Sequence, residues 1–251
     1  MQGVFSFPMT MARNANSPTL EQAREDAPDR KTQIIRSAQK LFALHGYHAV
    51  AIRQIADDAG VPLALVRYYY GAKDELFHAV FQRWNHVNEQ RLALLVEALG
   101  QRSGAKLLQR IVQAFAAPVL ALRDSEEGAH YAVMLSRELV HPTAEARRAG
   151  NAFLDPLARA FLDALQQTLP HVSREQIAWC YQLMVGSLMA HMQELQHARV
   201  HGLADVAPAD ERIDSGQLLV DFVVGGIQAV VSRGASASSD SRVSSAKKVS
   251  R

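Results

Sequence analysis

The sequence predicts an all-α protein, and three observations lead to this fold class. Apolar residues recur at helical spacing along most of the chain, the alternation typical of strands is missing, and no Asn-Gly or Asp-Gly pair marks a hairpin. With 251 residues, of which 48% are hydrophobic, the chain is long and apolar enough to bury a substantial core. The pattern divides the chain into a small N-terminal helical domain and a larger C-terminal helical domain, joined by a long helix.

Charge and cysteine content narrow the classes of function. The formal net charge is only +2, so a nucleic-acid-binding surface has to come from a local concentration of charge. Cys180 is the single cysteine, which excludes an intramolecular disulfide and a thiolate cluster for zinc. The N-terminal residues form no secretory leader, and no stretch reaches the ~18 uninterrupted apolar residues of a membrane span. We therefore expect a soluble, cytoplasmic protein without a metal, a cofactor or a membrane partner.

A flexible arm over residues 1–28 is expected to precede the first domain, which covers residues 29–84. The arm mixes Gly, Pro, Asn and Ser with scattered charges and has no apolar period. From Arg30 onward the pattern becomes helical, and glycines mark the ends of three short helices. We predict these helices over residues 30–45, 52–59 and 63–70, followed by a long helix from about Lys73 that leads into the second domain.

The second and third of these helices, with a tight turn at Gly60 between them, have the layout of a helix-turn-helix over about residues 51–70. In this motif the second helix of the pair enters the DNA major groove. Between Arg30 and Lys73, seven basic residues stand against two acidic ones, so the local charge is seven minus two, or +5. The alternative is a generic helical hairpin, but the local charge and the consecutive tyrosines after Arg67 favour a DNA-binding unit.

Three stretches of this domain, LFALHGY, IRQIADDAGV and YYYGAKDELF, resemble the TetR family of bacterial transcriptional regulators over about residues 30–84. The resemblance implies an all-helical homodimer with a three-helix DNA-binding domain and a larger C-terminal domain that binds a small-molecule effector. It also implies double-stranded operator DNA as a partner. Ala51, Pro62 and Arg67 stand where Thr, Ser and Tyr are common in the family, so the resemblance does not imply an operator sequence.

Eight residues are expected to contact DNA. Arg67, on the recognition helix, can pair with a guanine edge or with a phosphate, and Lys73 lies at a helix N-terminus, where a phosphate is favoured. Leu63 can meet a thymine methyl group or pack in the core, and Tyr69 can meet a phosphate or pack. Tyr70 is expected to lie in the core. The full set is Arg53, Gln54, Pro62, Leu63, Arg67, Tyr68, Tyr69 and Lys73.

The second domain is predicted over residues 85–232 as a series of longer helices. A kink is expected at Pro118, and Pro156 is expected to interrupt a helix. Ser173 and Gln176 form the sequence pattern of a capping box. The predicted helical ranges are 105–122, 126–140, 143–169, 173–199 and 212–232, and residues 233–251, rich in Ser, Ala and Lys, are expected to form a disordered tail.

Methionine and aromatic side chains in the second domain predict a binding site for an apolar effector, because such side chains suit apolar ligands. For each of them a core position is the alternative. The segment IAWCYQLMVGSLMAHM resembles the matching helix of family members whose effectors are fatty acids or acyl thioesters, and His130, Arg137 or His191 could bind a polar head group. The candidate lining residues are Phe115, Tyr131, Met134, Phe161, Trp179, Met184 and Leu188.

Small residues among large apolar ones in the helices 173–199 and 212–232 predict close helix packing in a homodimer, with burial inside a monomer as the alternative. We expect a ligand-responsive transcriptional regulator, most simply a repressor that binds a palindromic operator as a dimer and is released by its effector. The alternatives are an activator or dual regulator with the same fold, and a DNA-binding protein without an effector. Glu126, Glu127 and Glu138 are interpreted as surface charges, no catalytic set can be assembled, and an enzyme is not expected.

Overall fold

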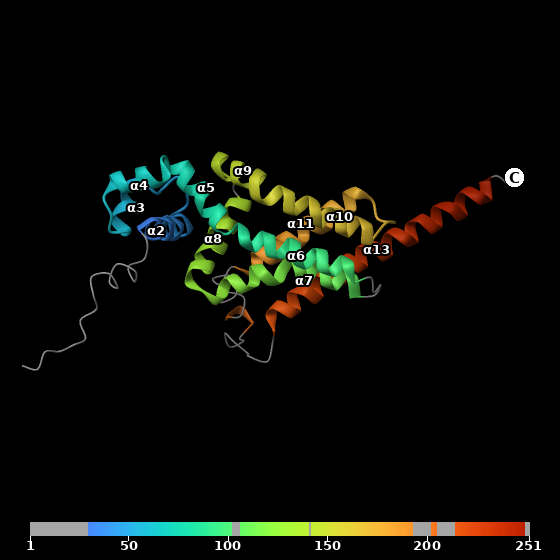
Figure 1. Ribbon diagram of the computed structural model, residues 1–251. Helices are drawn as coiled ribbons and strands as arrows, with labels where there is room; N and C mark the ends of the chain where they lie inside the picture. Colours follow the sequence, from blue (N-terminus) through green and yellow to red (C-terminus); the bar gives the residue numbers. More distant parts are fainter. Residues whose placement is uncertain (1–29, 102–105, 141, 193–201, 205–213, 249–251) are drawn as a thin grey trace, which may run out of the picture.

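The computed structural model describes residues 30–101, 106–140, 142–192, 202–204 and 214–248. Within these ranges the elements are helices and none is a strand, which confirms the all-α class. Figure 1 shows α2, α3 and α4 grouped at one end of the molecule, with the longer helices of the second domain making up the rest. The predicted arm over residues 1–28 lies outside the described residues.

The N-terminal domain is a compact group of four helices. The first three helices end close to the predicted glycines. Gly46, Gly60 and Gly71 all have positive φ angles, which end a helix. The core is built from fully buried apolar side chains, and the rings of Phe42 and Phe77 meet edge to face at 5.3 Å. The helices are α2 (Arg30–His45), α3 (Ile52–Asp58), α4 (Leu63–Tyr70) and α5 (Lys73–Arg83).

The single long helix predicted from Lys73 was wrong, because the chain breaks at Trp84. There α5 ends and α6 (Asn85–Gly100) begins. No Pro or Gly causes the break. The Trp84 side chain is held by partners from other helices: its indole N–H donates to Oε1 of Gln39 at 2.6 Å, and its ring stacks on Tyr131 at 5.1 Å. Tertiary contacts therefore decide where this helix is divided.

The C-terminal domain follows the predicted blocks with local differences at the prolines. Pro118 is buried in the last turn of α7, which passes into a 3-10 turn. The interruption near Pro156 is a π-helical turn just before it, and the proline itself lies in the first turn of the next helix. The elements are α7 (Leu107–Leu120), η2 (Ala121–Asp124), α8 (Glu126–Val140), α9 (Ala144–Ala149), η3 (Gly150–Leu154) and α10 (Asp155–Thr168).

The last two described helices, α11 (Arg174–His191) and α13 (Ser215–Lys248), pack against each other. The Ser173 capping box is confirmed, since the Ser173 hydroxyl accepts from the backbone N–H of Gln176 and the Gln176 side chain accepts from the N–H of Ser173, both at 3.2 Å. Residues 193–199 of the predicted helix lie outside the described residues.

The end of α13 differs from the expected disordered tail. The helix continues to Lys248, beyond the predicted boundary at residue 232, and its final turns extend past the other helices in Figure 1. Residues 233–248 contain no proline. Once an apolar helix has been nucleated, each further residue adds one hydrogen bond, so a polar sequence without proline can continue it.

Candidate nucleic-acid interface and effector site

The turn between α3 and α4 is fixed by backbone hydrogen bonds. Gly60, at φ 64°, donates its N–H to the carbonyl of Asp57 at 3.2 Å, and Val61 donates to the carbonyl of Ala56 at 3.0 Å. This pair of bonds is the Schellman motif, and the buried Val61 side chain adds the apolar contact that accompanies it. The direction in which α4 leaves the turn is thus set by the sequence around Gly60.

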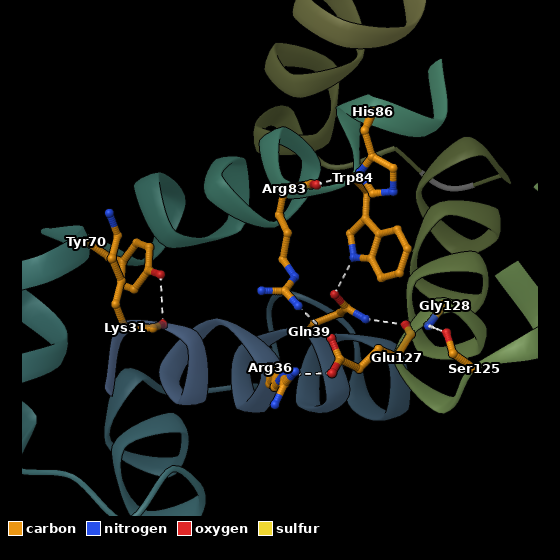
Figure 2. A network of polar contacts seen from close by, with 10 residues as sticks. All are labelled: Lys31, Arg36, Gln39, Tyr70, Arg83, Trp84, His86, Ser125, Glu127 and Gly128. Carbon is orange, nitrogen blue, oxygen red and sulfur yellow. Dashed lines mark hydrogen bonds and ion pairs between the residues drawn. The ribbon is translucent and has the colours of Figure 1, made fainter. Parts of the chain in front are cut away.

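Helix α4 is attached to the domain along one side. Val66 is fully buried, and Leu63 is half-buried against the same core, which favours packing for Leu63. The hydroxyl of Tyr70 donates to the backbone carbonyl of Lys31 in α2 at 2.9 Å (Figure 2). Tyr70, which was expected in the core, is partly buried, and its hydrogen bond joins α4 to α2.

The opposite side of α4 is open to solvent and carries the residue types that read DNA. Arg67 and Pro62 are exposed, and Tyr68 is 80% exposed beside Tyr69, whose ring it meets at 5.3 Å. A guanidinium on such a helix can reach a base edge or a phosphate, and a tyrosine hydroxyl can reach a phosphate. Arg67, Tyr68 and Tyr69 thus lie exposed on one helix, and their contacts with DNA stay a prediction.

At the start of α3, the side chain of Gln54 takes part in capping, because the N-cap residue Ala51 has no hydroxyl. Ala51 has no side-chain acceptor, but Oε1 of Gln54 accepts the N–H of Ala51 at 2.7 Å. Arg53 and Gln54 are both exposed. Gln54 therefore holds the N-terminus of α3 with its carbonyl oxygen and leaves its amide N–H groups available for the DNA backbone.

Lys73 lies in a different environment from the one expected. Its ammonium group lies over the ring of Tyr47 at 4.2 Å, and burial lowers the pKa of Lys73 while the nearby Glu145 opposes this shift. Burial, with Glu145 and Asp74, raises the pKa of Tyr47 to about 12. To meet a phosphate, Lys73 has to leave this ring, so its expected contact stays a prediction.

A polar network joins the N-terminal domain to α8 (Figure 2). The Glu127 carboxylate pairs with Arg36 of α2 at 2.6 Å and with Arg83 of α5 at 2.7 Å. The backbone carbonyl of Glu127 accepts from the Gln39 amide, whose oxygen accepts from the Trp84 indole. Since charge-assisted hydrogen bonds are the stronger ones, the network fixes α2 and α5 against α8.

Glu127 and Glu138 were wrongly interpreted as surface charges. Glu127 makes the interdomain contacts just described, and Glu138 is 6% exposed and accepts from the hydroxyl and the backbone N–H of Thr143. Their position on α8 carries no sequence signal for these roles, because the partners come from other segments of the chain.

Six of the seven candidate lining residues are buried in the C-terminal domain, at most 3% exposed. The rings of Phe115 and Phe161 meet edge to face at 5.3 Å, and Tyr181 meets Phe115 at 5.8 Å. Together with Tyr131 these rings form what we call the aromatic cluster. The six residues are Phe115, Tyr131, Met134, Phe161, Met184 and Leu188.

Two family models match the chain. Residues 34–80 match the model described as "Bacterial regulatory proteins, tetR family", and residues 113–226 match "Tetracyclin repressor-like, C-terminal domain". The chain belongs to the TetR family. Members of this family are helix-turn-helix transcriptional regulators that bind DNA.

Curated relatives of this TetR-family chain are also regulators. HbdR of Aromatoleum sp. (strain CIB) is 34% identical over 97 residues, which cover 39% of this chain and 42% of HbdR. The transcriptional activator FasR of Mycolicibacterium smegmatis is 35% identical over 28% of this chain and 38% of FasR. The dual regulator CecR of Shigella flexneri is 28% identical over 57% of this chain and 64% of CecR. In each case the match spans less than two thirds of the relative.

Solved structures of TetR-type regulators share the fold. HlyIIR, a hemolysin II transcriptional regulator, has a TM-score of 0.55 at 16% identity, covering 78% of this chain and 96% of that chain. The fatty acid degradation regulator FadR from Bacillus halodurans has a TM-score of 0.52 at 18% identity, covering 82% and 96%. At these identities the likeness concerns the fold alone.

The prediction that Trp179, the seventh candidate residue, lines the effector site was wrong. Trp179 is 57% exposed, so it does not line a site inside this TetR-family domain. The capping box at Ser173 sets the start of α11, and the inward face then carries Ile177, Cys180 and Met184, which leaves Trp179 on the outer face.

Two of the three expected head-group residues, Arg137 and His191, lie away from the aromatic cluster. Arg137 is exposed, and its guanidinium lies beside Gly46 at the end of α2. His191 lines a separate hollow of about 550 Å³, whose other charged lining residues are Arg123, Asp124 and Asp214. The residue that does reach the cluster is Arg91 of α6, which sequence reasoning missed.

Arg91 is 6% exposed, and its guanidinium lies over the ring of Phe115 at 4.2 Å. Burial lowers the pKa of Arg91 to about 10, with Tyr181 and Tyr131 opposing the shift, so the group stays protonated at neutral pH. The only available signal is its spacing in α6: Asn88 and Leu95, three residues before and four after it, are also buried.

Proposed function

We propose that this chain is a ligand-responsive repressor that binds a palindromic operator as a homodimer in the cytoplasm and is released by a small effector. The observation that carries the effector response is the pair of contacts that Trp84 makes, one with each domain. Trp84 touches Gln39 of α2 on one side and Tyr131 of the aromatic cluster on the other. A change at the cluster can therefore reach the helices that hold the DNA-binding motif.

For DNA binding we propose that Arg67 and Tyr68 face the major groove, while Arg53, Gln54 and Tyr69 contact the sugar-phosphate backbone. All five are exposed on the α3 and α4 side of the domain. A bidentate contact from arginine to guanine contributes about 1–3 kcal/mol of discrimination. Pro62, at the turn, and the half-buried Leu63 have supporting roles in this proposal, and Lys73 joins them when it leaves Tyr47.

The dimer is proposed to form through the outer faces of α11 and α13, within the predicted ranges 173–199 and 212–232. Both helices expose residues of the same kind at the same spacing: a large apolar side chain, a second one four residues later, a glycine three later and an alanine four later. The two stripes are Trp179, Leu183, Gly186 and Ala190 on α11, and Leu218, Phe222, Gly225 and Ala229 on α13.

Space and exposure support this interface. A Cβ atom added at Gly186, Gly225 or Gly226 would meet nothing within 4 Å in the single chain, so these glycines leave room for a second helix. The window Ser215–Ser232 is long and apolar enough to cross a membrane, and 17% of it is buried, yet it includes Asp221 and Gln217. A partner subunit explains this exposed apolar surface without a membrane.

The effector is proposed to be an apolar or aromatic molecule bound at the aromatic cluster. The description of FadR as a fatty acid degradation regulator agrees with an acyl effector. Binding would favour a state of the dimer in which the two recognition helices no longer match the half-site spacing, so the effector and the operator would compete by linkage. Because FasR is described as an activator and CecR as a dual regulator, activation by the same fold is the second candidate.

The test begins with selection of operator sequences from random duplex DNA by the purified protein. If a dimer neutralises about eight phosphates, log affinity should fall against log salt with a slope near −7. Arg67→Ala should relax sequence preference, whereas Arg159→Ala, at an exposed position on α10, serves as the control. Equal affinity for all sequences would instead support a DNA-binding protein without an effector.

The sign of regulation is tested separately. In transcription reactions from a promoter that carries the selected operator, a repressor lowers the yield of transcript, and an effector restores it. Native mass spectrometry of the purified dimer identifies a small molecule that copurifies with it. A rise in transcript on adding effector-free protein would contradict repression and support the activator.

A further inference from the structure

Arg91 is a buried cation that has no acidic partner among the described residues. It is the only Lys or Arg among the described residues that is buried, and none of its N–H groups is hydrogen-bonded or ion-paired within that part of the chain. Its Nε atom is fully enclosed and has no acceptor. A guanidinium carries five N–H donors, and the described residues use none of them, with only Nε fully enclosed.

The surroundings of Arg91 compensate its charge only partly. One face of the guanidinium lies over Phe115 at 4.2 Å, and Phe161 is 5.8 Å away. These cation-π contacts involve the faces of the group, whereas the N–H donors point out from its edge. Burying an ion without a hydrogen-bonded partner opposes folding, so a bound anion would recover free energy that the ligand-free protein lacks.

We propose that Arg91 binds the carboxylate of the effector and that the apolar body of the effector lies against the aromatic cluster. This inference rests on the proposed effector response and names the chemical class of the ligand. A single guanidinium edge matches a carboxylate in a bidentate pair. The absence of a second buried cation among the described residues argues against a ligand with several phosphate charges, such as a nucleotide thioester.

The position of Arg91 also connects the ligand to the domain junction. Tyr131 opposes the lowering of the Arg91 pKa, and Tyr131 stacks on Trp84 with 10° between the ring planes. Neutralising the charge of Arg91 therefore changes the field at the aromatic residue that supports the break between α5 and α6. A neutral ligand in the same place would not produce this change.

The test compares matched acids and alcohols on the full-length protein. The probes are decanoate with 1-decanol, and 3-phenylpropanoate with 3-phenylpropanol, and binding is measured by calorimetry. We expect at least one acid to bind the wild-type protein about 10- to 100-fold more tightly than its alcohol, the range for a hydrogen-bonded charge pair. In Arg91→Met this preference should disappear, whereas Arg159→Met should keep it.

Thermal unfolding without ligand gives a second readout. Because Arg91→Met removes an unpaired buried charge and keeps an apolar side chain of similar length, its melting temperature should equal or exceed that of the wild type. A melting temperature clearly below that of Arg159→Met would overturn the proposal, since it would mean that Arg91 stabilises the fold by itself. Equal binding of acid and alcohol, or no binding of any probe, would also overturn it.

Operator binding separates this inference from the proposed function. If an acid binds through Arg91 and leaves operator affinity unchanged, the carboxylate site stands and the effector response fails. If only an alcohol releases the operator, the effector response stands and the role of Arg91 fails.

Discussion

Phe222 provides the sharpest test of the proposed dimer. It is 71% exposed at the centre of the α13 stripe, between Leu218 and Gly225. In the single chain this ring lies in solvent, so Phe222→Ala should change the fold of the subunit very little. In a symmetric dimer two copies of the ring become buried, and both are lost together.

The magnitude follows from the surface. A phenylalanine side chain presents about 200 Å², of which 71% is about 140 Å². Because the alanine keeps its Cβ atom, truncation removes roughly 100 Å² of apolar contact from each subunit. At ~25 cal/mol per Å² this is ~2.5 kcal/mol per subunit and ~5 kcal/mol per dimer, an upper value. Truncation of a hot-spot residue near the centre of an interface costs about 2 kcal/mol or more. We therefore expect the dimer to dissociate at least ~30-fold more readily.

Sedimentation velocity over a dilution series measures this change. The matched control is Gln228→Ala, an exposed polar position at the border of the same stripe, which should leave the dissociation constant within about threefold of the wild type. Circular dichroism should show unchanged helicity for both variants. A monomeric wild-type protein at micromolar concentration, or a Phe222→Ala dimer as tight as the control, would refute the reasoning.

Three further predictions concern the fold and the domain junction. Gly128→Ala places a Cβ 2.1 Å from the carbonyl oxygen of Leu122, so urea unfolding should show a free energy of unfolding that is lower by about 1–3 kcal/mol. The control is Gly100→Ala, because a Cβ at Gly100 meets no atom within 4 Å. Trp84→Phe removes the indole N–H that donates to Gln39, so an effector identified by mass spectrometry should still bind. Its effect on operator affinity, measured by fluorescence anisotropy, should decrease. An unchanged effect would argue against coupling through the contact between Trp84 and Gln39. Burial raises the pKa of Asp58, but hydrogen bonds from Lys40 and Ser37 outweigh it and leave this pKa below its usual value. The ionised carboxylate thus stabilises the fold above the unfolded-state pKa, and Asp58→Asn should be less stable than wild type by up to ~1 kcal/mol at pH 7. This difference should shrink below about pH 4 and vanish once the pH falls below the lowered pKa of Asp58 in the folded protein. A difference that persists in acid would contradict this cause.

Local signals account for what the sequence predicted well. The helix ends at Gly46, Gly60 and Gly71 depend on a residue that adopts positive φ, and the start of α11 depends on the Ser173 capping box, both readable from a few neighbouring residues. The exposure of Arg67 and Tyr68 follows from the same short motif.

Features decided by distant partners were not predictable. The break at Trp84 needs Gln39 and Tyr131, and the role of Glu127 needs two arginines from other helices. Arg91 looks like an ordinary helix residue until the fold places it over Phe115. Charge inside a core has no local pattern, because burial is a property of the assembled helices.

The two tryptophans of the chain lie at the two places where the protein is proposed to change. Trp84 is stacked and hydrogen-bonded at the domain junction, whereas Trp179 is exposed on the outer face of α11. Intrinsic fluorescence of a variant that keeps only Trp84 would therefore follow events at the junction. A variant that keeps only Trp179 would follow subunit association, so the molecule carries a separate optical reporter for each event.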